Sequence, residues 1–166
     1  MSTASSPALH PTPAEYDPAV LYLLRHGEAV PRGEMEDAAR ALTAKGERQS
    51  VAAGKALAAL GAEIDACLTS PKVRAAGTAR LACEALPVEP ETTAELTGGA
   101  FDATALAAGR GDVLLVGHEP DFSNEIARLT GAKAKLRKGG LAIVDGSTLL
   151  ALLRPAELAA LADSQS

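Results

Sequence analysis

Aromatic side chains are almost missing from this sequence, which has two tyrosines, two phenylalanines and no tryptophan among its 166 residues. Basic residues are also outnumbered, with 16 Lys and Arg against 21 Asp and Glu and a formal net charge of −5. Proteins that bind nucleic acid stack bases on aromatic rings or follow the phosphates with a basic face. The composition favours neither mode, so we expect no nucleic-acid partner.

Cysteine is equally scarce, and long apolar runs are absent. Cys67 and Cys83 have no CxxC or Cys/His ligand spacing, so we expect them to be buried small side chains. No stretch approaches the roughly 18 apolar residues that cross a bilayer. Residues 1–18 lack the basic and apolar regions of a signal peptide. We therefore predict a disordered tail over 1–18, one domain over 19–166, a cytoplasmic location and no membrane partner.

Short apolar runs alternate with longer amphipathic stretches from Ala19 onward. This alternation is typical of parallel strands joined by crossover helices, and it predicts an α/β fold. The expected strands are 20–24, 64–69, 113–116, 141–144 and 148–153, and the expected helices are 43–60, 71–86, 102–108, 122–129 and 155–161. Thr43 and Ser70 are expected helix N-caps, Pro71 the first residue of its helix, Gly61 a C-terminal cap and Asp145-Gly146 a hairpin turn.

Histidines and arginines directly follow three of the predicted strands. The first strand leads into Arg25-His26-Gly27-Glu28, the second into Ser70-Pro71-Lys72-Val73-Arg74 and the third into Gly117-His118-Glu119-Pro120. The carboxyl ends of strands form the ligand crevice of a parallel sheet, so we expect these side chains to meet there. The remaining histidine, His10, lies in the predicted tail, and we assign it no function.

A cluster of two arginines and two histidines suits a phosphoryl group better than a metal ion. The guanidinium fork binds phosphate oxygens with two parallel hydrogen bonds, whereas two guanidinium charges repel a cation. Arg74 is expected in the first turn of a helix capped by Ser70, where free backbone amides also favour an anion. Gly27 and Gly117 flank the histidines and would let the backbone approach a ligand closely.

Five segments of the sequence resemble the histidine phosphatase superfamily, and more narrowly its short SixA-type phosphohistidine phosphatases. They are LLRHGEA at 23–29, RALTAKGERQ at 40–49, TSPKVRAAGTA at 69–79, VGHEPDFS at 116–123 and KGGLAIV at 138–144. The resemblance spans about residues 20–161. It implies a three-layer α/β/α sandwich with a mostly parallel central sheet, the phosphoglycerate mutase-like fold, and it implies no metal and no other cofactor.

The resemblance also implies catalytic roles. His26 would be the nucleophile that takes the phosphoryl group, while Arg25, Arg74 and His118, together with the backbone around Gly27, would bind the substrate. Two fixed cations beside His26 should also lower the pKa of its imidazole, which keeps the ring neutral at pH 7. Glu95 is the nearest match by position to the general acid of many relatives. Three other carboxylates lie close to the motifs, those of Glu28, Glu119 and Asp121, and Asp121 is equally suited to cap the helix near Phe122.

Chain length bears on the substrate. Larger members of this superfamily carry long insertions over the site, whereas only residues 28–44 separate the first motif from the next helix. An open site suits a phosphate on a protein surface, so we expect a monomeric phosphatase that acts on a histidine-phosphorylated protein. Two alternatives remain open at this stage: a phosphatase of small phosphomonoesters, and a non-catalytic module that binds phosphorylated ligands.

Overall fold

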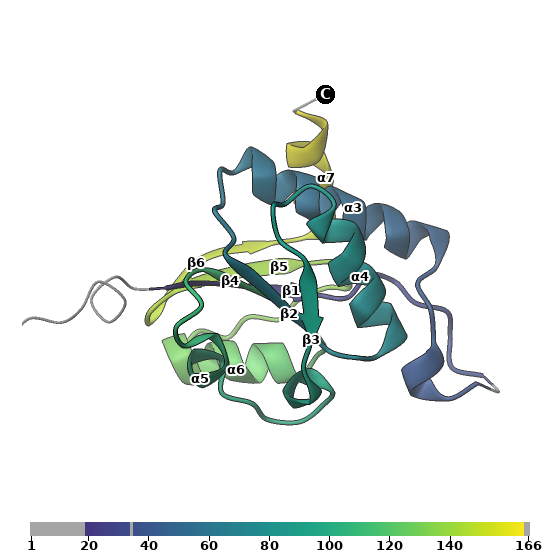
Figure 1. Cartoon of the computed structure of the whole chain (residues 1–166), viewed down its shortest axis with the longest axis horizontal. Helices are drawn as coiled ribbons and strands as arrows, with labels where there is room; N and C mark the ends of the chain where they lie inside the picture. Colours follow the sequence, from purple (N-terminus) through teal and green to yellow (C-terminus); the bar gives the residue numbers. More distant parts are fainter. Residues whose placement is uncertain (1–18, 34, 165–166) are drawn as a thin grey trace, which may run out of the picture.

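The central sheet has six strands in the order β3-β2-β4-β1-β5-β6 (Figure 1). The computed structural model describes residues 19–33 and 35–164, so the predicted tail and His10 lie outside the described residues. The strands are β1 Val20–Arg25, β2 Ala66–Thr69, β3 Pro90–Thr92, β4 Val113–Gly117, β5 Leu141–Asp145 and β6 Thr148–Leu153. Strands β1 to β4 pair in parallel, and the β5–β6 hairpin joins β1 antiparallel.

Helices cover both faces of the sheet, as Figure 1 shows. Helices α3 Ala44–Ala59, α4 Val73–Cys83 and α7 Pro155–Asp163 pack on one face, and α5 Ala103–Ala107 and α6 Asp121–Thr130 pack on the other. Strands β1 and β4 are buried on both sides, as their continuous apolar sequences predicted. The predicted three-layer α/β/α fold with a mostly parallel sheet is confirmed.

Two predicted helix starts coincide with the observed N-caps, and the last helix begins at Pro155 as predicted. Thr43 is the N-cap of α3 and its side chain accepts a hydrogen bond from the Gly46 amide, while Asp102, where a helix was expected to begin, caps α5 through the Ala105 amide. Gly61 follows α3 with a φ of 75°, which suits the C-terminal position expected for it. The hairpin turn at Asp145-Gly146 is also correct, since Gly146 has a φ of 60° between β5 and β6.

Other boundaries differ from the prediction. The helix expected over 71–86 begins at Val73, with Lys72 rather than Ser70 as its N-cap, and ends at Cys83. The physical reason is that Lys72 has an extended backbone, with φ −60° and ψ 138°, so the helix starts only after it, although the Ser70 hydroxyl still accepts from the Lys72 amide. Asp121 is the first residue of α6 rather than its cap, and its carboxylate accepts from the Gly99 amide.

Three short elements were not predicted at all. They are strand β3 and the 3-10 helices η1 Asp37–Ala39 and η2 Ala94–Leu96. Each has only three residues, which is too short for a hydrophobic period to reveal it. Strand β3 is exposed along its whole length and is fixed by pairing with β2.

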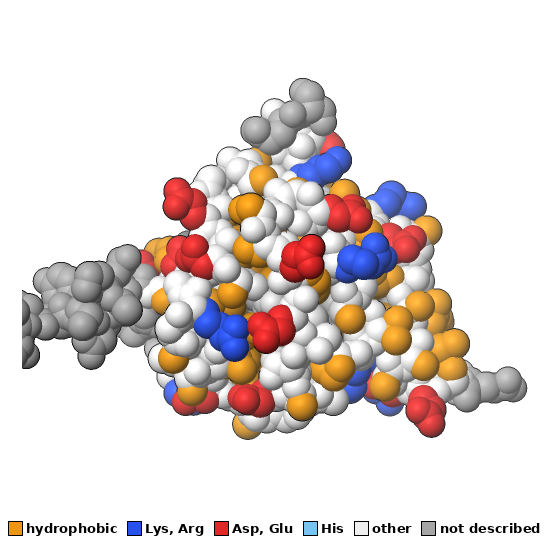
Figure 2. All heavy atoms as spheres, in the orientation of Figure 1, with side chains coloured by type: hydrophobic (Ala, Val, Ile, Leu, Met, Phe, Trp, Pro, Cys, Tyr) orange, Lys and Arg blue, Asp and Glu red, His pale blue; other side chains and the backbone are white. Residues whose placement is uncertain are grey.

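The face seen in Figure 2 carries no concentration of one charge. Acidic and basic side chains are scattered singly between apolar and uncharged groups. None of the helices in the described part of the chain is long and apolar enough to cross a membrane.

Small residues bring α3 and α4 into close contact. Ala53 and Ala56 of α3 are buried, as are Ala75, Ala79 and Ala82 of α4. A Cβ atom on Gly54 would lie 2.1 Å from the Ala82 carbonyl oxygen, so the two backbones approach as closely as a hydrogen side chain allows. The interface between α3 and α4 is therefore packed with alanine and glycine and contains no aromatic side chain from these two helices.

We expect Gly54→Ala to destabilise the protein by about 1–3 kcal/mol, because the new methyl group collides with rigid backbone and the two helices must separate. Urea unfolding followed by circular dichroism measures the change. Gly33→Ala is the matched control, since its Cβ would meet nothing within 4 Å. Equal stability of the Gly54→Ala and Gly33→Ala variants would contradict the close contact.

Candidate active site

Three neighbouring strands deliver the sequence motifs to one edge of the sheet. Because β2, β4 and β1 are adjacent and parallel, their carboxyl ends lie side by side. The His26 amide donates to the Gly117 carbonyl at 3.1 Å, and the Ser70 amide donates to the Val116 carbonyl at 3.0 Å. The strand ends that carry Arg25-His26, Ser70 and His118 are thus hydrogen-bonded to one another.

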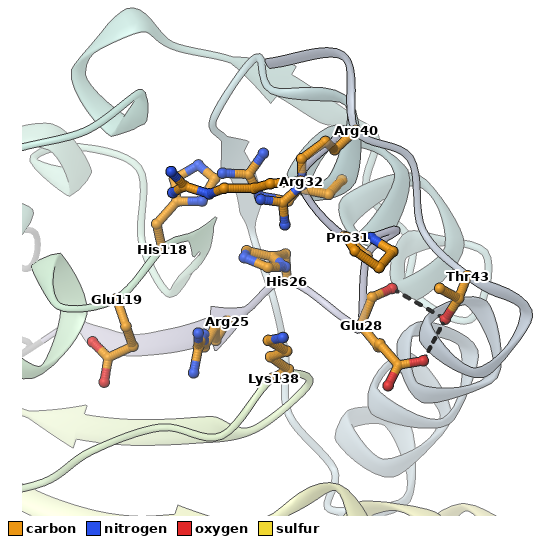
Figure 3. A pocket seen from close by; sticks show the side chains of 12 residues that line it. Arg25, His26, Glu28, Pro31, Arg32, Arg40, Thr43, His118, Glu119 and Lys138 are labelled. Atoms are coloured by element: carbon orange, nitrogen blue, oxygen red, sulfur yellow. Dashed lines mark hydrogen bonds between the residues drawn. The ribbon is translucent and has the colours of Figure 1, made fainter. Parts of the chain in front are cut away.

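A cavity of about 680 Å³ opens at this edge. Figure 3 shows His26 between Arg32 and Lys138, with His118 and Arg25 on one side and Glu28 on the other. The lining residues are Arg25, His26, Glu28, Ala29, Pro31, Arg32, Arg40, Thr43, Arg74, His118, Glu119 and Lys138. The structure therefore brings together all four residues of the predicted arginine and histidine cluster.

His26 is buried, and its tautomer follows from one hydrogen bond. The Nδ1 atom lies 2.7 Å from the Gly27 carbonyl oxygen, which can only accept, so Nδ1 carries the proton and Nε2 has a lone pair. The pKa of His26 is lowered to about 4, mainly by burial and also by the positive charges of Arg74, Arg25 and Lys138, against the opposing effect of the Gly27 hydrogen bond. At pH 7 the ring is therefore neutral, with a lone pair on Nε2.

His118 lies beside His26, with the ring centroids 5.3 Å apart and the rings tilted by 56°. Its Nε2 atom is 2.8 Å from the Ser70 hydroxyl oxygen, which also accepts from the Lys72 amide. The pKa of His118 is lowered to about 3, mainly by burial and also by His26, Arg74 and Lys72, against the opposing effect of the Asp37 carboxylate. When the Ser70 hydroxyl donates to Nε2, the neutral ring carries its proton on Nδ1.

Both arginines are held by backbone carbonyls. Arg25 Nη1 donates to the Leu136 carbonyl at 2.9 Å, and Arg74 Nη1 donates to the Asp37 carbonyl at 2.7 Å. Within the described part of the chain, three buried side-chain nitrogens have no hydrogen-bond partner: Arg25 Nε, Arg74 Nε and His118 Nδ1. All three belong to residues that line this one cavity. Buried donors without acceptors are costly, and the oxygens of a bound oxyanion would satisfy them.

The sequence model of the histidine phosphatase superfamily (branch 1) matches residues 21–105, which is more than half of the chain and includes Arg25, His26 and Arg74. The chain belongs to the histidine phosphatase superfamily. An uncharacterized protein of Picosynechococcus sp. is 36% identical to this chain over 134 residues, which cover 73% of this chain and 81% of that protein.

Solved structures of similar proteins agree with this membership. A SixA protein of Agrobacterium tumefaciens, described as a candidate phosphohistidine phosphatase, has a TM-score of 0.73 at 24% identity, over 83% of this chain and 99% of that one. The α-ribazole phosphatase of Shigella flexneri has a TM-score of 0.61 at 22% identity, over 82% of this chain and 96% of that one. The phosphoglycerate mutase-like, SixA-type fold is confirmed, and with the superfamily membership so is the enzyme class, a phosphatase.

The glycines beside the two histidines serve packing in this superfamily member. A Cβ atom on Gly27 would lie 2.5 Å from the Gly46 carbonyl oxygen, and one on Gly117 would lie 2.9 Å from the Phe122 ring. The Gly27 amide donates to the Thr78 hydroxyl at 3.0 Å. At these two glycines the close approaches within the protein are made by α3 and α6.

The predicted acid, Glu95, lies apart from the cluster. It is exposed on η2, and of the described residues it is not among those that line the cavity. Two other carboxylates do line it, and both are hydrogen-bonded. Glu28 Oε2 accepts from the Thr43 hydroxyl at 2.8 Å (Figure 3). Glu119 accepts from the Ser123 amide at 2.7 Å and from the Leu136 amide at 2.9 Å.

No group of three or more His, Cys, Asp or Glu side chains in the described ranges is arranged to hold a metal ion.

Sequence reasoning missed three cations that line the cavity, namely Arg32, Arg40 and Lys138. Arg40 and Lys138 begin two of the segments that carry the family resemblance, so a signal for them was present. They were overlooked because neither residue directly follows a parallel strand.

Asp37 links several of the cations around the cavity. Its carboxylate lies 3.0 Å from Arg40, 3.1 Å from Lys72 and 3.1 Å from Arg74. Hydrogen bonds from Lys72 and Arg74 hold the pKa of Asp37 well below its usual range. The loop that carries Asp37 thereby fixes the direction in which Arg74 points.

We expect Asp37→Asn to lower kcat about tenfold without weakening inhibition by inorganic phosphate. The asparagine keeps the backbone acceptor for Arg74 but removes the charge that orients its guanidinium group, while the cavity becomes more positive. Steady-state kinetics with phosphate as inhibitor measure both quantities. Asp102→Asn on α5 is the control. A parallel loss of kcat and of phosphate binding would show that Asp37 supports the fold alone.

Proposed function

We propose that this chain is a metal-independent phosphatase that uses His26 as nucleophile and acts on phosphohistidine carried by a protein. The observation that carries the proposal is the set of three buried nitrogens that have no partner among residues 19–33 and 35–164, beside a neutral His26. They belong to Arg25, Arg74 and His118, so each would donate to a phosphoryl oxygen. The cytoplasmic location and monomeric state expected from the sequence are part of this proposal.

In the first step, the Nε2 lone pair of His26 attacks the phosphorus atom and forms a P–N bond. The P–N bond of the substrate breaks, and its electron pair returns to the leaving ring nitrogen. The substrate imidazole departs neutral when its other ring nitrogen carries a proton. Arg25, Arg74 and the Nδ1 proton of His118 stabilise the charge that spreads over the equatorial oxygens.

In the second step, a water oxygen attacks the phosphorus atom of phosphorylated His26. The new P–O bond forms as the P–Nε2 bond breaks, a proton of the water passes to solvent, and inorganic phosphate leaves. His26 regains its Nε2 lone pair, and the Gly27 carbonyl keeps the Nδ1 proton in place throughout. Two displacements replace one difficult hydrolysis.

The leaving group decides between the substrate classes. An imidazole has a reference pKa of about 6.5 and leaves readily, whereas an alkoxide requires a proton from a general acid. The two carboxylates that line the cavity, those of Glu28 and Glu119, are already engaged by hydrogen bonds. Because these carboxylates are hydrogen-bonded and an imidazole needs no general acid, the site favours phosphohistidine as substrate over a phosphomonoester. For the alternative, a small phosphomonoester, Glu95 stays the proposed acid, and Glu95→Gln should then slow monoester hydrolysis.

A panel of substrates tests the proposal. We expect a histidine-phosphorylated carrier protein to be hydrolysed with a kcat/KM at least about tenfold above that of sugar or nucleotide monoesters. Phosphate release from each substrate at the same enzyme concentration is the measurement. Faster turnover of one monoester would assign the protein to the small-molecule phosphatases, and no turnover of any substrate would favour the binding module.

The protonation of His26 gives a second test. In the free protein we expect the His26 ring to titrate near pH 4, so the nucleophilic form dominates above that pH and is lost as the pH falls through it. NMR titration of the imidazole resonances measures this directly. A midpoint for His26 above pH 6 would contradict the assignment.

A further inference from the structure

The segment between α6 and β5 presents a row of positive charges. Lys133, Lys135, Arg137 and Lys138 are exposed, while the intervening Ala134 and Leu136 are buried. This alternation directs the first three cations to the same, outer side of the segment. We call these four residues the basic strip.

The basic strip joins two hollows of the surface. Lys138 lines the cavity around His26, as Figure 3 shows. Lys133 and Lys135 line a second hollow of about 340 Å³ along α6, together with Ser123 and Asn124. A ligand that covers the strip would therefore extend from the phosphoryl site to this second hollow.

The charges of the basic strip are not neutralised within the described residues. None of the four has a carboxylate oxygen within 4.0 Å there, whereas Arg74, Arg128 and Arg154 each form an ion pair. Glu157 lies near enough to Arg137 to be influenced by its charge, but its carboxylate is hydrogen-bonded to Arg154. On a chain with a net charge of −5, this is an uncompensated local excess of positive charge.

Hydrogen bonds tie the strip to the active site. The Gly139 amide donates to the His26 carbonyl at 2.9 Å, and Arg25 Nη1 donates to the Leu136 carbonyl at 2.9 Å. The Leu136 amide donates in turn to Glu119 Oε2. A partner bound to the strip is thus held in a fixed position relative to His26.

We propose that the basic strip is the docking surface for an acidic face of the histidine-phosphorylated protein. This inference rests on the proposed function and names the kind of protein that the site receives. Acidic side chains near the phosphohistidine would pair with the strip, increase the association rate and place the phosphoryl group at the cavity. Nucleic acid is the less favoured polyanion, because the strip contains no aromatic residue to stack a base.

Synthetic peptides test the docking surface. Each carries one phosphohistidine flanked over about eight residues on each side by glutamates, glutamines or lysines, a length that spans the strip when extended. We expect kcat/KM to rise about tenfold from the lysine to the glutamate peptide. The double variant Lys133→Glu/Lys135→Glu should abolish this preference for the glutamate peptide. Lys55 is an exposed lysine of α3, and Lys55→Glu should preserve the preference.

The outcomes separate the two proposals. Equal rates for all three peptides with wild-type enzyme would overturn the docking surface and retain the proposed substrate. Hydrolysis of phosphomonoesters without hydrolysis of any phosphohistidine peptide would overturn both. A single-stranded oligonucleotide that inhibits more strongly than the unphosphorylated glutamate peptide would overturn the acidic protein partner. If the double variant still preferred the glutamate peptide over the lysine peptide, the acidic residues would be recognised at another surface, and the docking proposal would be overturned.

Discussion

His26→Ala is expected to lower kcat by a factor on the order of 10⁵, because it removes the nitrogen that we propose accepts the phosphoryl group. The Gly27 carbonyl holds the proton of His26 on Nδ1, which leaves a lone pair on Nε2. The other histidine in the described part of the cavity, His118, has its Nε2 atom hydrogen-bonded to Ser70 and so offers no such lone pair. Phosphate release from the preferred substrate measures the loss.

Rapid quenching in alkali gives an independent measurement of the same step. Wild-type enzyme mixed with radiolabelled substrate should retain label that is stable in alkali and lost in acid, and His26→Ala should retain none. His10→Ala is the matched histidine control and should behave as wild type. Label on the His26→Ala variant, or residual activity within about a hundredfold of wild type, would assign the nucleophile to another residue.

Arg74→Met is expected to lower kcat/KM about 10²- to 10³-fold, the usual cost of removing one preorganised donor from a developing oxyanion. Arg74 is buried, its Nε has no protein partner in the described residues, and Asp37 fixes its guanidinium group through two hydrogen bonds. Arg74→Lys should recover little of the loss, because an ammonium group keeps the charge but not the planar fork.

Arg80→Met is the matched control for this prediction. Arg80 lies on the same helix, α4, with an exposed side chain 3.8 Å from Glu84, and its replacement should leave kcat/KM unchanged. Thermal unfolding in the presence of phosphate separates binding from folding, since phosphate should raise the Tm of Arg80→Met but much less that of Arg74→Met. Full recovery of activity in Arg74→Lys would show that charge alone matters at this position.

Much of the architecture was predictable, because periodic burial leaves a clear trace in the sequence. The continuous apolar runs of β1 and β4 predicted strands covered on both faces, and the polar residues after them predicted the crevice. Boundaries were less predictable where side chains had competing partners. Ser70 has the chemistry of a helix cap, but its hydroxyl is bonded to His118, and no local pattern contains that information.

The sequence by itself determined the α/β class, the three strand ends and the cluster of two arginines and two histidines that lines the cavity. Only the tertiary structure decided that Asp37 orients Arg74, that Lys138 lies beneath His26 and that Glu95 stands outside the cavity. Strand ends are ordered by regular backbone hydrogen bonds that hydrophobic patterns encode. Loops take their course from a few long-range contacts between residues far apart in the chain, and no periodic pattern records those contacts.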